Sequence, residues 1–296
     1  MHRALPLAAC LALASASVGC GARAQTPPRA AATSSSGATA QAPPCGLDSA
    51  RLRSLGAPTA MATATTVYPH SPPNRNMNLA TAARYLCGRV LAPGATLSFN
   101  ATIGETTAAR GYTVGPVFVG DRVVPGWGGG VCQVATTLYD AARRAGIDVV
   151  ERHNHGMRVP YVPPGEDATV ASPWLDLVVR NSTAGPLVVV AGARENRVTV
   201  SLYGTEEPPE TAFRHEILST TPYPTVRLAD PSLPSGTEVT VQAGVDGTVA
   251  HTWFTVRRAG QPERVMDLGV DRYRPSPHIV RYGTAVAAPP KAPARS

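Results

Sequence analysis

The sequence is poor in charged and aromatic side chains. Of its 296 residues, 16% are Asp, Glu, Lys or Arg, and 5% are Phe, Trp or Tyr. Coiled coils and acidic solvating tails are rich in charge, so this composition excludes both. Glycine and proline are frequent instead, with 27 and 29 residues. That content is high for a helical protein and lower than expected for a fully disordered one.

The excess of positive charge is also small. The formal net charge is +7, but Arg3, Arg23 and Arg29 lie in the first 44 residues, which contain no acid. The rest of the chain therefore carries a net charge of only +4. Nucleic-acid-binding proteins typically have basic runs interleaved with aromatic residues, and this sequence has no such run. We expect no nucleic-acid partner, whereas an anionic polymer such as the cell wall is compatible.

Residues 1–24 have the layout of an export signal. His2 and Arg3 precede an apolar run over Ala4–Ala16 that is too short to span a bilayer. Two processing sites compete, because a small-x-small site ends at Ala24 and a lipobox-like sequence ends at Cys20. We expect an exported lipoprotein, anchored in the membrane through acylated Cys20. A cleaved periplasmic or secreted form is the alternative.

Composition and periodicity divide the remaining chain. Residues 25–44 are mostly Pro, Ala, Ser, Thr and Gln and predict a disordered linker. Residues 45–205 predict an α+β domain with early helices and a mostly antiparallel sheet. Residues 215–285 are short β-like runs separated by Gly, Pro and Asp and predict a small all-β domain. Residues 286–296 form an Ala/Pro-rich tail that we expect to be disordered.

Two helices and several strands are predicted inside the first domain. Asn78 is a candidate cap for a helix over Leu79–Cys87. From Val131, apolar residues recur at i, i+3 and i+4 until Gly146, which predicts a second helix. The pattern also predicts a hairpin at 117–124 and strands at 147–151, 174–180, 187–190 and 197–203.

The cysteines predict one disulfide and one unpaired thiol. Five are present, and Cys10 and Cys20 belong to the export signal. In an oxidising compartment, Cys45 and Cys87 are the natural disulfide pair. Cys132 is then left over, and an odd cysteine in an exported protein indicates either a reactive thiol or intermolecular pairing. A buried inert cysteine is the structural alternative.

The residues around Cys132 favour a nucleophile. Cys132 is expected in the first turn of the second helix, where unpaired N–H groups and the helix dipole stabilise a thiolate. Gly128, Gly129 and Gly130 let a substrate approach closely, and their N–H groups can form an oxyanion hole. Gln133 can add an amide donor.

A base is predicted about twenty residues later. His153 and His155 alternate on a strand and therefore share one face, so either can serve Cys132. Asp167 or Asp176 can orient that base. Trp127, Arg152 and Tyr161 are candidate substrate-binding residues beside the glycines. Alternatives are a purely structural glycine turn and a zinc site of Cys132 with the two histidines; we expect neither a metal nor a cofactor.

The same residues resemble the VanW family. The resemblance covers roughly residues 59–204, and its most specific part is the Gly-Gly-Gly-Val-Cys-Gln sequence that ends at Gln133. The other matching segments occur in the same order, at 74–76, 93–94, 97–100, 104, 111–112, 125–126, 138–139, 151–155, 161–163, 165, 167–169, 176 and 181.

This resemblance implies an exported envelope protein. Some members are associated with L,D-transpeptidase activity, which crosslinks peptidoglycan stem peptides through a cysteine. Carried over, Cys132 is the nucleophile and His155 or His153 is the base. Residues 217–284 also resemble the five-glycine domain, which implies a module that binds sugars of the wall or acts as a spacer.

Two functions therefore follow from the sequence. The first is Cys-dependent acyl transfer on peptidoglycan stem peptides. The second is a non-catalytic lipoprotein that binds or scaffolds the cell wall. Both make peptidoglycan the expected partner.

Overall fold

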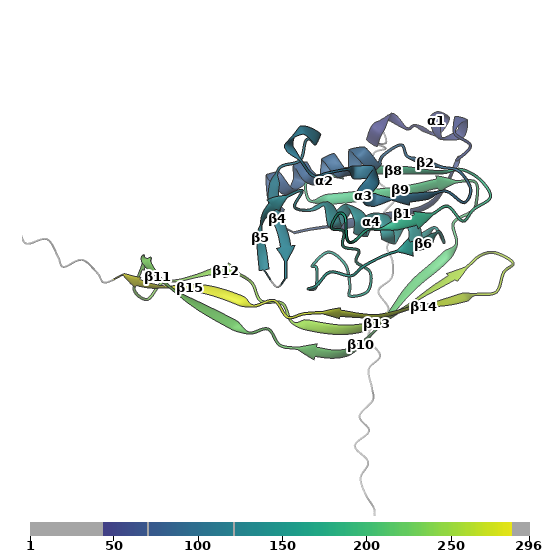
Figure 1. The fold of residues 1–296 in the computed structure, drawn as a ribbon. Helices are drawn as coiled ribbons and strands as arrows, with labels where there is room; N and C mark the ends of the chain where they lie inside the picture. The colour runs from purple at the N-terminus through teal and green to yellow at the C-terminus, as the bar shows by residue number, and fades with distance from the viewer. Residues whose placement is uncertain (1–43, 70, 121, 286–296) are drawn as a thin grey trace, which may run out of the picture. The chain divides into compact units, whose positions relative to one another are not determined.

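A computed structural model describes residues 44–69, 71–120 and 122–285 of the chain (Figure 1). The export signal predicted at 1–24, the lipidation site at Cys20 and the tail at 286–296 lie outside these residues. The linker predicted at 25–44 also lies outside them, apart from its last residue. No helix among the described residues has the length and apolar character needed to span a membrane.

An antiparallel sheet of four strands is the centre of the N-terminal part. The strand order is β1 (Thr59–Val67), β9 (Arg197–Gly204), β8 (Leu187–Arg194) and β2 (Val90–Leu91). In β8 the first five residues are all buried, whereas β9 alternates between buried and partly exposed positions. An uninterrupted apolar strand indicates burial on both faces, and alternation indicates burial on one.

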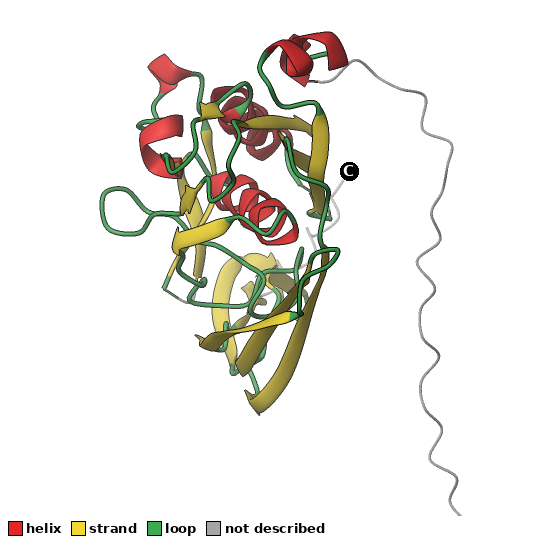
Figure 2. Cartoon of the chain, turned by 90° about the vertical axis from the view of Figure 1, so that its right-hand side faces the viewer, coloured by secondary structure: helices red, strands yellow, loops and turns green. Residues whose placement is uncertain are grey.

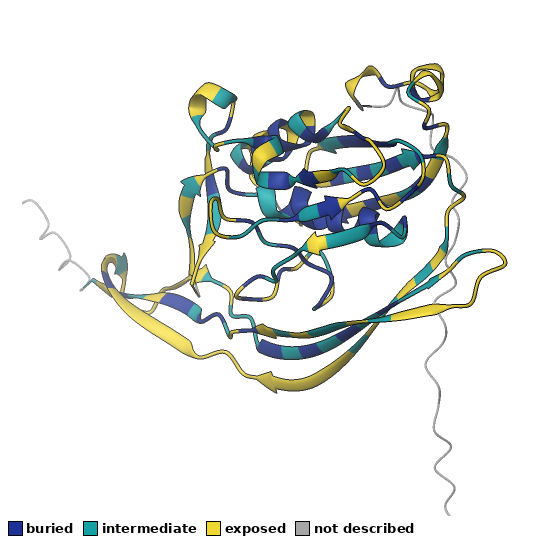
Figure 3. Cartoon of the chain, turned by 45° about the vertical axis from the view of Figure 1, so that its right-hand side comes forward, coloured by how far each residue is buried: buried dark blue, intermediate teal, exposed yellow. Residues whose placement is uncertain are grey.

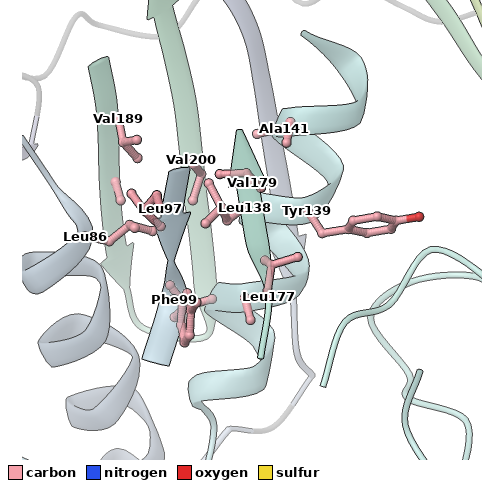
Figure 4. Close-up of a cluster of buried hydrophobic side chains, with 14 of the residues drawn as sticks. Leu86, Leu97, Phe99, Leu138, Tyr139, Ala141, Leu177, Val179, Val189 and Val200 are labelled. Atoms are coloured by element: carbon pink, nitrogen blue, oxygen red, sulfur yellow. The ribbon is translucent and has the colours of Figure 1, made fainter. Parts of the chain in front are cut away.

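Two helices pack against this sheet (Figure 1). Helix α2 (Pro73–Leu86) contacts β8, and helix α4 (Val131–Arg144) contacts β1 and β9. Their buried side chains join those of the sheet in one core, and Figure 4 labels Leu86 of α2 and Leu138 of α4 within it. Both leucines are fully buried, and burying such a side chain stabilises a fold by about 1.5–3 kcal/mol.

Smaller elements complete this part of the chain. The 3-10 turn η1 (Pro44–Gly46) is linked to the end of α2 by the Cys45–Cys87 disulfide. The other elements are α1 (Ser49–Ser54), α3 (Phe99–Ile103), η2 (Ala108–Arg110), the sheet β3 (Thr96–Ser98), β7 (Val178–Arg180) and β6 (Asp148–Glu151), and the hairpin β4 (Val114–Val119) and β5 (Arg122–Trp127).

Helix α2 begins earlier than the sequence predicted. It starts at Pro73, and its N-cap is Pro72 rather than Asn78. Asn78 is fully buried in the second turn. Its amide donates to the carbonyls of Thr113 and Gly129 at 2.9 Å and accepts from Thr113 N–H at 2.8 Å. Proline is favoured in the first turn of a helix, which explains the earlier start. Asn78 instead makes hydrogen bonds to residues distant in the chain, and its local sequence does not show these.

The C-terminal part contains only strands among the residues described. One sheet has the order β10 (Glu210–Thr221), β13 (Gly247–Arg257) and β14 (Arg264–Tyr273), and the other has β11 (Thr225–Pro234), β15 (His278–Ala285) and β12 (Glu238–Gln242). Pairing is antiparallel except between β11 and β15. Figure 2 distinguishes the helices from these strands, and Figure 3 shows long exposed stretches on β10, β11 and β12.

The predicted fold class is confirmed. Helices occur early, most strand pairs are antiparallel, and an all-β part follows.

Replacing Asn78 with Ala tests how α2 holds the turn before α4. The substitution removes the Asn78 hydrogen bond of the Thr113 N–H and of the Gly129 carbonyl, and a polar group left unpaired in this way costs about 1–3 kcal/mol. The carbonyl of Thr113 loses one of its two donors and keeps the N–H of Gly128. We expect Asn78→Ala to lower the free energy of unfolding by about 3 kcal/mol in urea denaturation.

The matched control is Asn76→Ala on the same helix. With the residues described, the Asn76 amide makes one long hydrogen bond, 3.4 Å to Ser71 O, so its loss should cost under about 1 kcal/mol. Equal losses for the two variants would contradict the role assigned to Asn78.

Candidate active site

The glycine-rich segment before α4 places Cys132 in the first turn of that helix. Gly128 and Gly130 have φ angles of 70° and 114°, a region that glycine adopts without strain. A Cβ on Gly129 would lie 2.4 Å from the carbonyl carbon of Gly115. Because the backbones pack this closely, side chains at these positions would displace the turn that presents Cys132.

The Cys132 thiol is half-buried and unpaired. Its Sγ lies 3.6 Å from both Thr169 Oγ1 and the carbonyl oxygen of Val170. Burial alone raises the pKa of this thiol, but the hydrogen bond and charge of His155 and the contacts with Val170 and Thr169 outweigh burial and lower the pKa. The arrangement therefore favours the thiolate, which is the nucleophilic form of cysteine.

His155 is the imidazole that interacts with this thiol. Its side chain is 2% exposed, and Nδ1 lies 2.7 Å from Asp167 Oδ2. The second ring nitrogen, Nε2, is buried and has no hydrogen-bond partner at ordinary geometry among the described residues. Cys132 and His155 nevertheless interact, and each shifts the pKa of the other. Burial opposes the charged ring, but Asp167 and Cys132 together raise the pKa of His155 to about 9.

Asp167 is held by donors on both carboxylate oxygens. Oδ2 accepts from Nδ1 and the backbone N–H of His155, both at 2.7 Å. Oδ1 accepts from Arg152 at 3.0 Å and from the Tyr273 hydroxyl at 2.5 Å. Burial by itself raises the pKa of Asp167, and the bonds to His155, Arg152 and Tyr273 lower it. The carboxylate therefore stays ionised while fully buried.

Two of the supporting groups come from β14. Tyr273 bonds Asp167 and accepts from the N–H of Gly165 at 2.7 Å. Asp271 accepts from Arg152 Nη1 at 2.8 and 2.6 Å. The C-terminal sheet thus fixes both the carboxylate and the guanidinium behind His155.

Helix α4 fixes the same segment from the other side. Thr136, one turn after Cys132, donates its hydroxyl to Ala168 O at 3.0 Å and accepts from Ala168 N at 2.9 Å. Because Ala168 follows Asp167 directly, the Cys132 thiol and the Asp167 carboxylate are held by the same helix.

A cavity of about 960 Å³ opens beside Cys132. Its lining includes Cys132, His155 and the flanking glycines Gly128 and Gly130. Among its other described lining residues are Tyr68, Arg75, Glu105, Phe118, Trp127, Tyr161, Thr169, Arg272 and Arg274.

The structure brings several predicted residues together. Cys132, His155 and Asp167 form a continuous chain, with Trp127 and Tyr161 along the same cavity. The Tyr161 ring lies 6.5 Å from that of His155. The half-exposed Trp127 ends β5.

Other predicted residues lie elsewhere. Strand β6 ends at Glu151, so the alternation expected to aim His153 and His155 at one face is lost. His153 Nε2 lies 3.0 Å from Glu151, and its side chain is 39% exposed. Asp176 bonds Ser98 and the N–H of Asn100 instead of a histidine.

Gln133, Gly129 and Arg152 are also engaged away from the thiol. The Gln133 amide nitrogen donates to Thr66 O and Oγ1 at 3.2 and 3.1 Å. Gly129 packs on the backbone of Gly115. Arg152 lies behind Asp167, bonded to both Asp167 and Asp271.

Sequence reasoning missed four residues of this site: Arg75, Thr169, Asp271 and Tyr273. Arg75 lies in the Asn-Arg-Asn sequence at 74–76, which contributed to the family resemblance but did not indicate a role for the arginine. Asp271 and Tyr273 alternate with Arg272 and Arg274 along the end of β14 and the residue that follows it. Only the packing of that strand on the His155 segment reveals that the first pair supports Asp167 and the second lines the cavity.

The three central groups do not converge on a metal position. His155 bonds Asp167 through Nδ1 and interacts with Cys132, so the three groups form a chain. No group of three or more metal-ligating side chains is found among the described residues. An ionised thiol, an imidazole and an orienting carboxylate form the general arrangement of an activated nucleophile.

Family models match both parts of the chain. Residues 74–203 match the model described as VanW like protein, and residues 215–285 match the G5 domain model.

Among similar proteins is the uncharacterized protein YoaR of Bacillus subtilis (strain 168). It is 36% identical over 141 residues, which cover 48% of this chain and 46% of YoaR. The Vancomycin B-type resistance protein VanW of Enterococcus faecalis (strain ATCC 700802 / V583) is 25% identical over 140 residues, covering 46% of this chain and 51% of that protein. The aligned part spans about half the length of each relative.

Two solved structures match smaller parts of the chain. The IgA1 protease G5 domain is 24% identical and covers 28% of this chain and 100% of its own, with a TM-score of 0.18. The structure titled HP0197-G5 is 20% identical and covers 25% of this chain and 99% of its own, with a TM-score of 0.15.

This chain therefore contains a segment similar to VanW-like proteins at residues 74–203, followed by a segment similar to the G5 domain at residues 215–285.

Proposed function

We propose that this protein is an exported cell-envelope enzyme that transfers acyl groups of peptidoglycan stem peptides through Cys132. The observation that carries the proposal is the Cys132–His155–Asp167 chain at the wall of a large cavity. A structural cysteine needs neither a buried imidazolium nor an oriented carboxylate.

The geometry supports a two-step reaction. The Cys132 thiolate attacks the carbonyl carbon of a peptide bond, forming a C–S bond and a negatively charged oxygen. As the C–N bond breaks, His155 Nε2–H gives its proton to the departing amine. An acceptor amine or water then attacks the thioester and gives its proton to His155. The C–S bond breaks and the thiolate is restored.

The first turn of α4 offers a donor for the developing oxyanion. The N–H groups of Val131 and Gln133 bond the carbonyls of Gly128 and Gly130. The N–H of Cys132 is one of the groups that a helix start leaves without an intrahelical partner. We assign it to the substrate oxygen, where a donor strengthens as charge develops.

The substrate class rests on the relatives and on the predicted export. The name of the Enterococcus relative connects that protein with vancomycin resistance, and the export signal predicted from the sequence implies transport out of the cytoplasm. Peptidoglycan stem peptides are amide substrates present there. In this proposal the G5 domain holds the protein on the wall, and acylated Cys20 holds it on the membrane.

A second candidate function is wall binding without catalysis. Strands β10, β11 and β12 expose apolar side chains to solvent, among them Ile217, Leu228 and Val241. Exposed apolar patches often mark interaction surfaces. Wall pull-down that survives loss of Cys132, together with absence of turnover by the native protein, would favour this candidate.

The acyl-enzyme provides the first test. After incubation with muropeptides, intact-mass analysis should show an adduct on Cys132 whose mass equals the peptide less its leaving amino acid. Cys132→Ala should give no adduct and at least a 1,000-fold lower rate of product formation, because the nucleophile is lost. An unchanged product profile in this variant would refute the proposed function.

The pH dependence of peptide turnover provides the second test. The thiolate is lost as pH falls through the lowered pKa of Cys132. The proton needed by the leaving amine is lost as pH rises through the pKa of His155, about 9. We expect a bell-shaped profile of kcat/KM whose lower limb lies below the usual cysteine pKa and whose upper limb lies near pH 9.

Asp167→Asn and Asp176→Asn form a matched pair for the same measurement. Loss of the Asp167 charge removes a main cause of the raised His155 pKa, so the upper limb should fall by more than one unit. Asp176→Asn should leave that limb in place. Equal profiles for both variants, each checked for folding by circular dichroism, would contradict the role of Asp167.

A further inference from the structure

Arg75 is a buried cation that faces the cavity from α2. Its side chain lines the cavity, and the residue is 4% exposed. The guanidinium lies 4.0 Å from the Tyr68 ring centroid. Nη1 donates to Ser71 Oγ at 3.1 Å. These contacts fix the orientation of the group without neutralising its charge.

No Asp or Glu among the described residues forms an ion pair with Arg75. Arg152, which is buried to a similar degree, pairs with both Asp167 and Asp271. A buried charge without a partner is costly, so an unpaired guanidinium beside a cavity indicates an anionic ligand. Burial lowers the pKa of Arg75, but arginine remains charged at neutral pH.

Arg75 also lies beside the turn that carries the nucleophile. A Cβ built on Gly130 would lie 2.9 Å from Arg75 Cγ and 3.4 Å from its Nε. Gly130 precedes Cys132 by two residues, and Arg75 and Cys132 interact electrostatically. An anion held by Arg75 would therefore lie within about one residue of the reacting carbonyl.

Other charges of the cavity have the same sign. Arg272 of β14 and Arg274, which directly follows that strand, line it, whereas Glu105 is the acidic side chain among its described lining residues. The excess of positive charge thus attracts anions into the cavity, where Arg75 can bind one in a fixed orientation.

We propose that Arg75 binds the free carboxylate of the substrate residue on the leaving side of the scissile bond. This inference rests on the proposed acyl transfer. It specifies that the enzyme cleaves the last peptide bond of a chain, because only that bond has a terminal carboxylate next to it. The planar guanidinium suits two parallel hydrogen bonds to such a group.

Two small alkylating agents test the anion site without requiring turnover. Iodoacetate carries a carboxylate, and iodoacetamide is its neutral analogue of similar shape. We expect Arg75→Gln to lower the ratio of Cys132 alkylation rates, iodoacetate over iodoacetamide, by about 10-fold or more. Arg75→Lys should lower this ratio of rates by a smaller factor, because lysine retains the positive charge but lacks the two parallel N–H donors of the guanidinium.

The matched control is Arg89→Gln, which removes an exposed arginine outside the cavity lining. Its ratio should equal that of the native protein. A ratio unchanged in both Arg75 variants would overturn the proposal. In a second contradictory outcome, Arg75→Gln shifts the pH profile of iodoacetamide alkylation by a full unit but leaves the ratio of rates unchanged. That result would mean that Arg75 stabilises the Cys132 thiolate rather than a ligand, and it would also overturn the proposal.

Peptide binding separates this inference from the proposed function. In the Cys132→Ala background, a stem peptide with a free terminal carboxylate should bind about 10-fold to 100-fold more tightly than its C-terminal amide. Adding Arg75→Gln should abolish the difference. Equal affinities, together with a normal acyl adduct in the native protein, would reject the anion site and keep the enzyme. Absence of the adduct would reject the enzyme, and a retained difference in affinity would still support the anion site.

Discussion

The hydrogen bond between His155 Nδ1 and Asp167 is the interaction on which the site depends. A buried imidazole ordinarily loses its proton, because burial disfavours the charged form. Asp167, itself kept ionised by Arg152 and Tyr273, reverses that tendency and keeps His155 protonated. The protonated ring in turn stabilises the Cys132 thiolate. In the proposed reaction, the Asp167 carboxylate behind the imidazole therefore determines whether Cys132 is ionised.

The fold supplies this interaction by holding one irregular segment between two rigid elements. Thr136 of α4 bonds Ala168, and Tyr273 of β14 bonds Asp167 and Gly165. A Cβ on Gly165 would lie 1.9 Å from Thr252 Oγ1, so the segment also packs closely on β13. The C-terminal sheet is consequently part of the support of the site, in addition to any role in binding the wall.

Features that depend on neighbouring residues in the chain could be predicted from the sequence. The glycines, the apolar period after Val131 and the odd cysteine predicted a helix with Cys132 in its first turn. The sequence could not choose between His153 and His155, because that choice depends on β6 ending at Glu151. The role of Arg75 and the contributions of β14 were also out of reach, since they arise from packing between residues distant in the chain.

The protonation state of His155 tests the central claim most directly. Nuclear magnetic resonance of ¹⁵N-labelled protein follows each histidine ring as pH changes, and the loss of one signal in His155→Gln assigns it. The account predicts that the ring stays protonated on both nitrogens at pH 7.5 and titrates near pH 9. A neutral His155 ring at pH 7.5, with a pKa at or below the ordinary histidine value of about 6.5, would contradict the account.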